Sequence, residues 1–186
     1  MPEGLSPYRP EFEAALRVFG RVSEGMRAAG HLPPVLVGGG AIELYSASAI
    51  TTGDFDVVTS RQDVFEAVLL DHGFSRLPGS GHVAGGWIHA ELRLGFEVVG
   101  DSLLDGNADR ARIRLIDLGA DGRIAVISLE DVIADRMGQY ASGTAVEMRD
   151  QARALYRLYP DADLDYMDRR IREETSGDHG IESLHP

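Results

Sequence analysis

The segment from Val35 to Val58 constrains the fold most, because it joins a short apolar run, three consecutive glycines and two carboxylates in one short stretch. The run VLV predicts a buried strand that ends at Gly38, Gly39 and Gly40, and the letters AIELYSASA predict a helix after it. A glycine turn in that position exposes backbone N–H groups and lets a phosphate approach closely. The same glycines also fit a tight turn that needs only positive φ or close packing.

Asp54 and Asp56 flank one phenylalanine in the run DFDVVTS, which reads as a strand. Residues two apart in a strand point to the same side, so the two carboxylates converge. Carboxylates this close repel each other, and a divalent cation neutralises them well. The alternative is a polar strand end that faces water.

A third carboxylate follows in the run ELRLGFEVV, where apolar and polar residues alternate. Leu92, Leu94, Phe96 and Val98 form the apolar face. Glu97 belongs to the opposite face, on a strand that we expect to neighbour Asp54 and Asp56. Glu91 is the competing candidate, and an exposed glutamate without a function is the alternative for either residue.

Missing residue types exclude several chemistries. The chain has 186 residues, no Cys, and 18 basic residues that are all arginine. Thiol nucleophiles, thiolate zinc sites and disulfides are excluded, as are a lysine-containing phosphate loop and Schiff-base catalysis. Positive charge against a phosphate must therefore come from arginine, a metal or backbone N–H groups. The net charge of −12 argues against bulk, non-specific binding of nucleic acid.

The order of predicted elements indicates an α+β fold, with a mixed β-sheet flanked by helices and a C-terminal helical segment. Pro10 opens a helix that Gly30 ends, and Ser128 with Asp131 resembles a capping box. Residues 74–86 are rich in turn formers. We expect strands over 35–37 and 54–60 and helices over 41–49 and 61–73. A strand or hairpin arm is expected over 86–100 and a hairpin over 110–118 and 122–129, followed by helices over 129–141, 145–158 and 163–174.

We expect a core over residues 1–128, a helical segment over 129–175 packed on it, and a flexible tail over 176–186. No apolar run is long enough to cross a bilayer, and the N-terminus lacks the features of a secretory signal. We therefore expect a cytoplasmic protein that does not bind membranes.

The joint pattern resembles the nucleotidyltransferase superfamily of DNA polymerase β type. Members carry a Gly-Gly or Gly-Ser turn, then Asp-x-Asp on a strand, then a later third carboxylate. Gly39-Gly40 and Asp54-Phe55-Asp56 match this spacing most clearly within residues 33–60. The C-terminal helices resemble those of minimal and abortive-infection (type IV toxin-like) members, with Arg136 and the pair Arg149-Asp150 in the matching positions.

The chain departs from the family pattern in three ways. Gly40 stands where a serine is usual, the third carboxylate is a glutamate, and lysines near the triphosphate are absent. These departures leave a catalytically silent copy as an alternative.

The resemblance implies that Asp54, Asp56 and Glu97 bind Mg²⁺ (or Mn²⁺) and are the catalytic residues. It also implies that Gly38, Gly39, Gly40 and Arg136 hold a nucleoside triphosphate. The reaction would move a nucleoside monophosphate to a hydroxyl acceptor and release pyrophosphate. Arg136 lies half inside the apolar stripe of its helix, so it either points into a cleft or pairs with Asp131 or Asp150.

The sequence leaves three candidates for the acceptor: a tRNA 3′ end, a protein hydroxyl and a small molecule. Two arginine patterns could guide an RNA 3′ end, and the alternative for both is solvated charge paired with acids. They are Arg110, Arg112 and Arg114 on one strand face, and Arg149, Arg153 and Arg157 along one helix face. The net charge of −12 suits a cationic small acceptor slightly better than RNA. The toxin-like resemblance also implies a toxin–antitoxin role and a partner protein. Two other classes remain, a silent interaction protein and a small glycosyltransferase that uses Asp-x-Asp.

Overall fold

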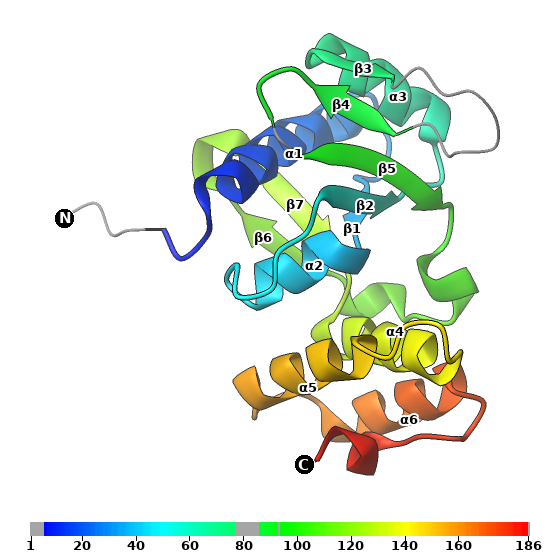
Figure 1. Ribbon diagram of the computed structural model, residues 1–186. Coiled ribbons are helices and arrows are strands. Elements are labelled where there is room, and N and C mark those ends of the chain that lie inside the picture. Colours follow the sequence, from blue (N-terminus) through cyan, green and yellow to red (C-terminus); the bar gives the residue numbers. More distant parts are fainter. Residues whose placement is uncertain (1–5, 77–85, 93, 186) are drawn as a thin grey trace.

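A computed structural model describes residues 6–76, 86–92 and 94–185 of the chain. Six α-helices and seven strands lie in this part (Figure 1). The helices are α1 (Pro10–Ala28), α2 (Gly38–Tyr45), α3 (Gln62–Asp71), α4 (Leu129–Ala141), α5 (Met148–Leu158) and α6 (Leu164–Glu174). The strands are β1 (Val35–Leu36), β2 (Asp54–Val58), β3 (Phe74–Arg76), β4 (Trp87–His89), β5 (Gly95–Gly100), β6 (Arg114–Asp117) and β7 (Arg123–Val126).

The seven strands form one mixed sheet in the order β3-β4-β5-β2-β1-β7-β6. β2 pairs with β5 in parallel and β1 pairs with β7 in parallel, while the other neighbours are antiparallel. This confirms the expected α+β fold with a mixed sheet. The parallel pairing of β2 and β5 sets Asp56 opposite Glu97, so it determines the geometry of the candidate site.

One face of the sheet is apolar and covered by helices. Phe55 and Phe96 stack with ring centroids 5.1 Å apart, and Phe19 of α1 contacts both rings edge-on. All three side chains are fully buried. Because side chains alternate along a strand, burying Phe55 turns Asp54 and Asp56 to the opposite face. The apolar core thus decides where the carboxylates point.

Helices α5 and α6 both pack on α4 at one end of the molecule (Figure 1). Ser128 caps α4 as the sequence predicts, since its Oγ accepts the N–H of Asp131. Arg170 of α6 and Asp131 of α4 form a fully buried ion pair of 2.9 Å. Tyr159 bonds the carbonyl oxygen of Tyr45, which ties the end of α5 to α2.

Three stretches differ from expectation. Phe74–Arg76 is a strand rather than a turn, and residues 77–85 lie outside the described part of the chain. Arg110–Arg112 is a 3₁₀ helix capped by Asp109, so the expected strand begins only at Arg114. The expected flexible tail folds back as a 3₁₀ helix over Ile181–Leu184, because Leu184 is fully buried and Arg153 bonds the carbonyl oxygen of Ser183.

In the described part of the chain, no helix has both the length and the apolar content to cross a membrane.

Candidate active site

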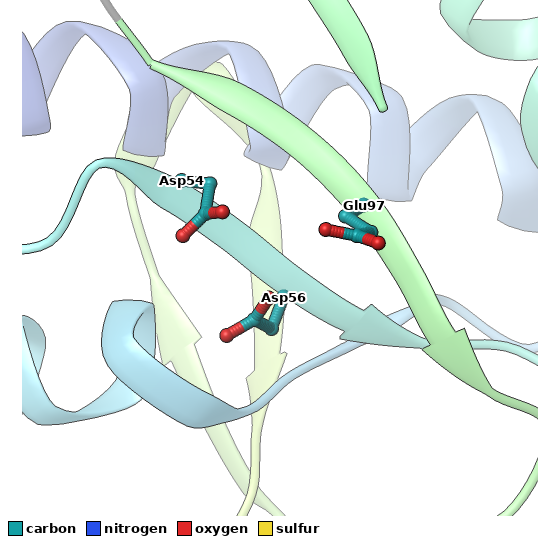
Figure 2. Close-up of side chains that lie close together, drawn as sticks. All are labelled: Asp54, Asp56 and Glu97. Atoms are coloured by element: carbon teal, nitrogen blue, oxygen red, sulfur yellow. The ribbon is translucent and has the colours of Figure 1, made fainter. Parts of the chain in front are cut away.

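Three carboxylates meet on the face of the sheet that the apolar core leaves free. Asp54 and Asp56 project from β2 and Glu97 projects from the neighbouring β5 (Figure 2). One oxygen of each side chain lies within 4.8 Å of the others, and all three residues are half-buried. Among the two glutamates weighed from the sequence, the structure therefore places Glu97 beside the aspartates.

The electrostatics of the cluster centre on Asp56. Burial raises the pKa of this carboxyl to about 6, and the negative charges of Asp54 and Glu97 add to the rise. The backbone N–H of Gly39 and the guanidinium of Arg136 oppose the rise. Because the ionised form of this carboxyl is unfavourable in the folded chain, a bound cation would stabilise it strongly.

The three glycines form the first turn of α2 rather than a loop before it, and each has a different role. Gly38 has φ +54° and lies so close to Asp56 that a Cβ there would overlap its carboxylate. Gly39 donates its N–H to Asp56 Oδ2 at 3.3 Å. Gly40 is buried, and its Cβ would lie 2.7 Å from Leu36 Cδ1. The position at which the resembled family pattern has a serine thus faces the core.

A buried polar network, which sequence reasoning missed, holds the loop between α2 and β2. Glu43 is fully buried and accepts hydrogen bonds from Arg9 Nε at 2.6 Å and from the N–H of Thr52 at 2.7 Å. The hydroxyl of Thr52 donates to the carbonyl oxygen of Asp54 at 3.1 Å. Glu43 therefore fixes the chain immediately before the first aspartate. A buried glutamate in an apolar helix was the available signal.

A cleft of about 470 Å³ opens beside Asp56. The sheet supplies one wall, α4 supplies another, and Asp101–Asp105 closes a third side. Within α4, Arg136 is 7% exposed and donates to Gln139 at 2.9 Å. The lining residues are Val37, Gly38, Asp56, Val58, Val99, Gly100, Asp101, Ser102, Leu104, Asp105, Ile127, Val132, Asp135, Arg136 and Gln139.

Arg136 faces this cleft, as one of the two sequence interpretations had it. Its ion pair is with Asp135 at 3.7 Å, and Asp131 binds Arg170 instead. Its Nε is buried and bonds no atom of the described residues. An arginine held inside a cleft wall with an unused donor is suited to an anionic ligand.

Three residues predicted with lower weight lie elsewhere. Glu91 follows β4 at the surface and lines a separate hollow with His72 and His89, because the chain bends there instead of continuing as one long strand. Arg149 stacks on Tyr140 and donates to its hydroxyl at 3.0 Å. Asp150 is exposed on α5. None of the three lines the cleft beside Asp56.

Neither arginine pattern forms a continuous free stripe. Arg112 pairs with Asp163 at 2.8 Å and stacks on Tyr166, and Arg114 lies over the ring of Tyr45. Arg153 bonds carbonyl oxygens near the C-terminus. The expected strand face with Arg110, Arg112 and Arg114 was wrong, because the first two belong to a 3₁₀ helix.

The cleft contains acids that sequence reasoning missed. Asp101, Asp105 and Asp135 all line it. Asp105 and its neighbour Leu104 have positive φ values of 54° and 45°, a backbone state that costs energy in residues other than glycine. Alternation and motif spacing do not reveal such loop residues. The adjacency of Asp135 to Arg136 was the one available signal.

The donor set suits a hard divalent cation. Carboxylate oxygens are the ligands that Mg²⁺ and Mn²⁺ prefer, and three of them converge here. The pKa of Asp56 is raised mainly by burial and then by the charge of Asp54, and a bound cation would offset both effects. The residues present therefore fit the metal that the sequence resemblance implies.

Comparison with known proteins supports the fold through structure and not through sequence. No family model matches the chain, and no curated protein matches it. Similar solved structures include an antigenic nucleotidyltransferase-like protein from Paracoccidioides brasiliensis, with a TM-score of 0.62, 13% identity and coverage of 95% of this chain and 93% of that one.

The antibiotic-resistance factor ANT(2'')-Ia is similar in two structures. Its solution structure has a TM-score of 0.57 and 15% identity, covering 88% of this chain and 92% of that one. Its crystal structure with adenylyl-2''-tobramycin has a TM-score of 0.57 and 16% identity, covering 90% and 98%. The chain has the nucleotidyltransferase fold.

The nucleotidyltransferase fold was predicted from two aspartates, a glycine turn and a later carboxylate, and the structure places these elements together. Each similar structure spans most of both chains, so the likeness extends beyond the strands that carry the carboxylates.

Proposed function

We propose that this chain is a metal-dependent nucleotidyltransferase that moves a nucleoside monophosphate from a nucleoside triphosphate to a hydroxyl acceptor. The convergence of Asp54, Asp56 and Glu97 beside a cleft that also contains Arg136 carries the proposal. The similar structures support it, because they are nucleotidyltransferases or nucleotidyltransferase-like proteins.

Asp54, Asp56 and Glu97 would hold Mg²⁺ or Mn²⁺. When bound, the divalent metal lowers the pKa of the acceptor hydroxyl and offsets phosphate charge. Gly38 lets the first turn of α2 approach Asp56 closely, since a Cβ at this position would overlap the carboxylate.

In the proposed reaction the acceptor hydroxyl oxygen forms a bond to the α-phosphorus, and the bond from that phosphorus to the pyrophosphate oxygen breaks. Glu97 accepts the hydroxyl proton, and the electron pair of the broken bond leaves with pyrophosphate. Arg136 offsets the charge that develops on this leaving group. Its buried position makes the contact strong, because few water molecules compete for the guanidinium.

The proposed acceptor is a small molecule whose reacting end carries positive charge. Asp101, Asp105 and Asp135 line the cleft and favour a cation, and the whole chain has a net charge of −12. ANT(2'')-Ia, a protein of similar fold, has been crystallised with adenylylated tobramycin. A tRNA acceptor is less favoured, since Arg112 and Arg153 are already bonded within the chain.

One observation favours a catalytically silent protein of the same fold. Gly40 cannot take the serine that is usual in relatives unless Leu36 moves, so the hydroxyl contact to phosphate is absent. The fold comparisons give no support to a glycosyltransferase.

Calorimetric titration and label transfer separate these proposals. We expect ATP, GTP, CTP or UTP to bind only with Mg²⁺ or Mn²⁺, and Asp56→Ala to abolish binding, while the exposed Asp161→Ala leaves it unchanged. Transfer from α-labelled nucleotides into cell extract then identifies the acceptor. Label on tRNA would instead support the toxin-type role, and metal-dependent binding without any transfer would support the silent protein. Nucleotide binding that is unchanged in Asp56→Ala would contradict the proposed metal site.

A further inference from the structure

A second feature lies on the same face of the sheet as the carboxylates. Directly opposed residues of neighbouring strands project to one face, and the register opposes Val58 to Val35, Val35 to Ala125 and Ala125 to Leu115. Asp56 lies two residues before Val58 and so shares this face. With strands about 4.8 Å apart, the row from Val58 to Leu115 spans about 14 Å.

At the far end of this row is a groove of about 370 Å³, within the size range of small-molecule sites. Val35, Ala125 and Leu115 form its floor, and Leu32 and Ile113 contribute apolar walls. Leu32 is 65% exposed and Leu115 is 60% exposed, so the groove presents apolar surface to solvent. Its described lining contains no acid.

Arginines surround this apolar surface. Arg27 is offset by Glu24 at 2.7 Å and donates to the carbonyl oxygen of Arg123 at 2.8 Å. Arg110 and Arg123 line the same groove and form no ion pair with any residue in the described ranges. Asp117 lies opposite Arg123 in the strand register, but neither guanidinium is held in an ion pair within the described ranges, in contrast with the net charge of −12 of the whole chain.

The groove and the cleft are neighbours on the sheet. A smaller hollow between them is lined by Val35, Val58, Asp101 and Arg110 among others. It shares Val58 and Asp101 with the cleft, and Val35 and Arg110 with the groove. This hollow has a volume of only about 10 Å³, so a ligand that extends from the carboxylates to the arginines must displace the exposed side chains of Asp101 and Arg110.

We propose that this arginine-rimmed groove (Arg27, Leu32, Val35, Arg110, Ile113, Leu115, Arg123 and Ala125) binds the distal part of the acceptor, an apolar group that carries a carboxylate or phosphate. Arg110 and Arg123 bind the anion, and Leu32 and Leu115 contact the apolar part. The acceptor is then zwitterionic, with its cationic, hydroxyl-bearing end among the cleft acids. This assignment rests on the proposed function.

The site is tested first with an aromatic anion, 8-anilinonaphthalene-1-sulfonate, followed by fluorescence and by amide chemical shifts of the ¹⁵N-labelled chain. We expect the largest shifts at Leu32, Val35, Leu115 and Ala125. The double variant Arg110→Gln/Arg123→Gln should weaken binding about tenfold. The exposed arginines of the matched control Arg157→Gln/Arg169→Gln lie outside the groove, so its affinity should stay unchanged.

A matched ligand series then defines the chemistry. Hexanoate and hexyl phosphate should displace the dye at concentrations about tenfold lower than hexan-1-ol or hexylamine. Comparing the two anions distinguishes a carboxylate from a phosphate ligand. Equal displacement by the alcohol, equal loss in the control variant, or shifts confined to the cleft would each overturn the proposal.

The role of the groove in acceptor binding is tested by label transfer. The label from α-labelled nucleotide is followed into the small molecules that an anion exchanger retains. Arg110→Gln/Arg123→Gln should raise KM for this fraction with little change in kcat, and should leave metal-dependent nucleotide binding intact. If nucleotide binding fails in the unaltered chain while the dye still binds the groove, the proposed function is wrong and the anion site stands. If nucleotide binds but neither dye nor anions reach the groove, only the groove proposal is wrong.

Discussion

The ionised carboxylate of Asp56 destabilises the folded chain, yet the proposed metal site requires it. Its pKa rises from 3.8 to about 6 on folding, mainly through burial and then through Asp54. Below about pH 4 the carboxyl is protonated in both the folded and unfolded chain and contributes nothing. Above about pH 6 it is ionised in both, and the folded state bears the whole penalty.

Asp56→Asn should therefore stabilise the metal-free protein at pH 8. Complete burial would make the gain about 3 kcal/mol, and partial exposure reduces it to about 1 kcal/mol. Thermal unfolding in EDTA checks this, with a rise of about 2–4 °C expected at pH 8 and no difference near pH 4. Asp161→Asn is the matched exposed control. A lower unfolding temperature at pH 8 would contradict the assigned pKa rise.

A substitution at Gly39 tests whether the first turn of α2 must lie close to the loop that precedes β2. A Cβ there would overlap the hydroxyl of Thr52, which donates to the carbonyl oxygen of Asp54. Gly39→Ala should cost about 1–3 kcal/mol of unfolding free energy and weaken Mn²⁺ binding about tenfold. Gly53→Ala, with open space around its Cβ, is the control for a general glycine effect. Equal results for the two variants would show that the close approach is not required.

At this scale, strand alternation placed Glu91 and Glu97 on the same polar face and left the choice between them open. The folded chain decides it, because Glu97 lies opposite Asp56 while Glu91 lines a separate hollow. Alternation could not show that Gly40 packs on Leu36, since helix position decides that contact. It also missed Asp101 and Asp105, which lie in a connecting segment, and Glu43 of α2, whose partners Arg9 and Thr52 only the folded chain brings together.

Among the elements, amphipathic helices with clear caps were predicted well. The α4 helix runs over Leu129–Ala141 as its capping residues indicated. The failures lie where short alternating runs imitate a strand. Arg110 and Arg112 alternate with apolar residues, yet Asp109 caps a 3₁₀ turn there and Asp163, distant in sequence, binds Arg112.

The contact between α4 and α6 depends on the buried pair of Asp131 and Arg170. Tyr166 also donates to Asp131, and Glu173 and Glu174 bind the same guanidinium. Arg170→Met should cost about 3–5 kcal/mol, because it leaves Asp131 buried without its partner.

Urea unfolding of Arg170→Met, Asp131→Asn and the double variant measures this coupling. The double variant should lose clearly less than the sum of the two single losses, since no lone charge then remains. Arg61→Gln removes the exposed pair with Asp63 and should leave stability unchanged. Additive losses in the double variant would rule out a direct interaction.

For the whole molecule, the sheet and α4 each contribute a wall of the cleft. Asp56 comes from the sheet and Arg136 from α4, so a metal-bound nucleotide would join the two layers. A ligand that binds only the folded chain raises its unfolding temperature. The size of that rise, measured with metal alone and then with metal and nucleotide, separates what each layer contributes.

Arg136→Gln should keep the stabilisation by Mg²⁺ alone, because the carboxylates remain, and should lose most of the further rise with ATP. Asp56→Asn should lose both rises. Arg157→Gln on the exposed face of α5 should lose neither, and NaCl matched in ionic strength to MgCl₂ corrects for screening of the net charge of −12. If Arg136→Gln retained the full ATP effect, the nucleotide would be bound by the sheet alone and α4 would serve only as a wall.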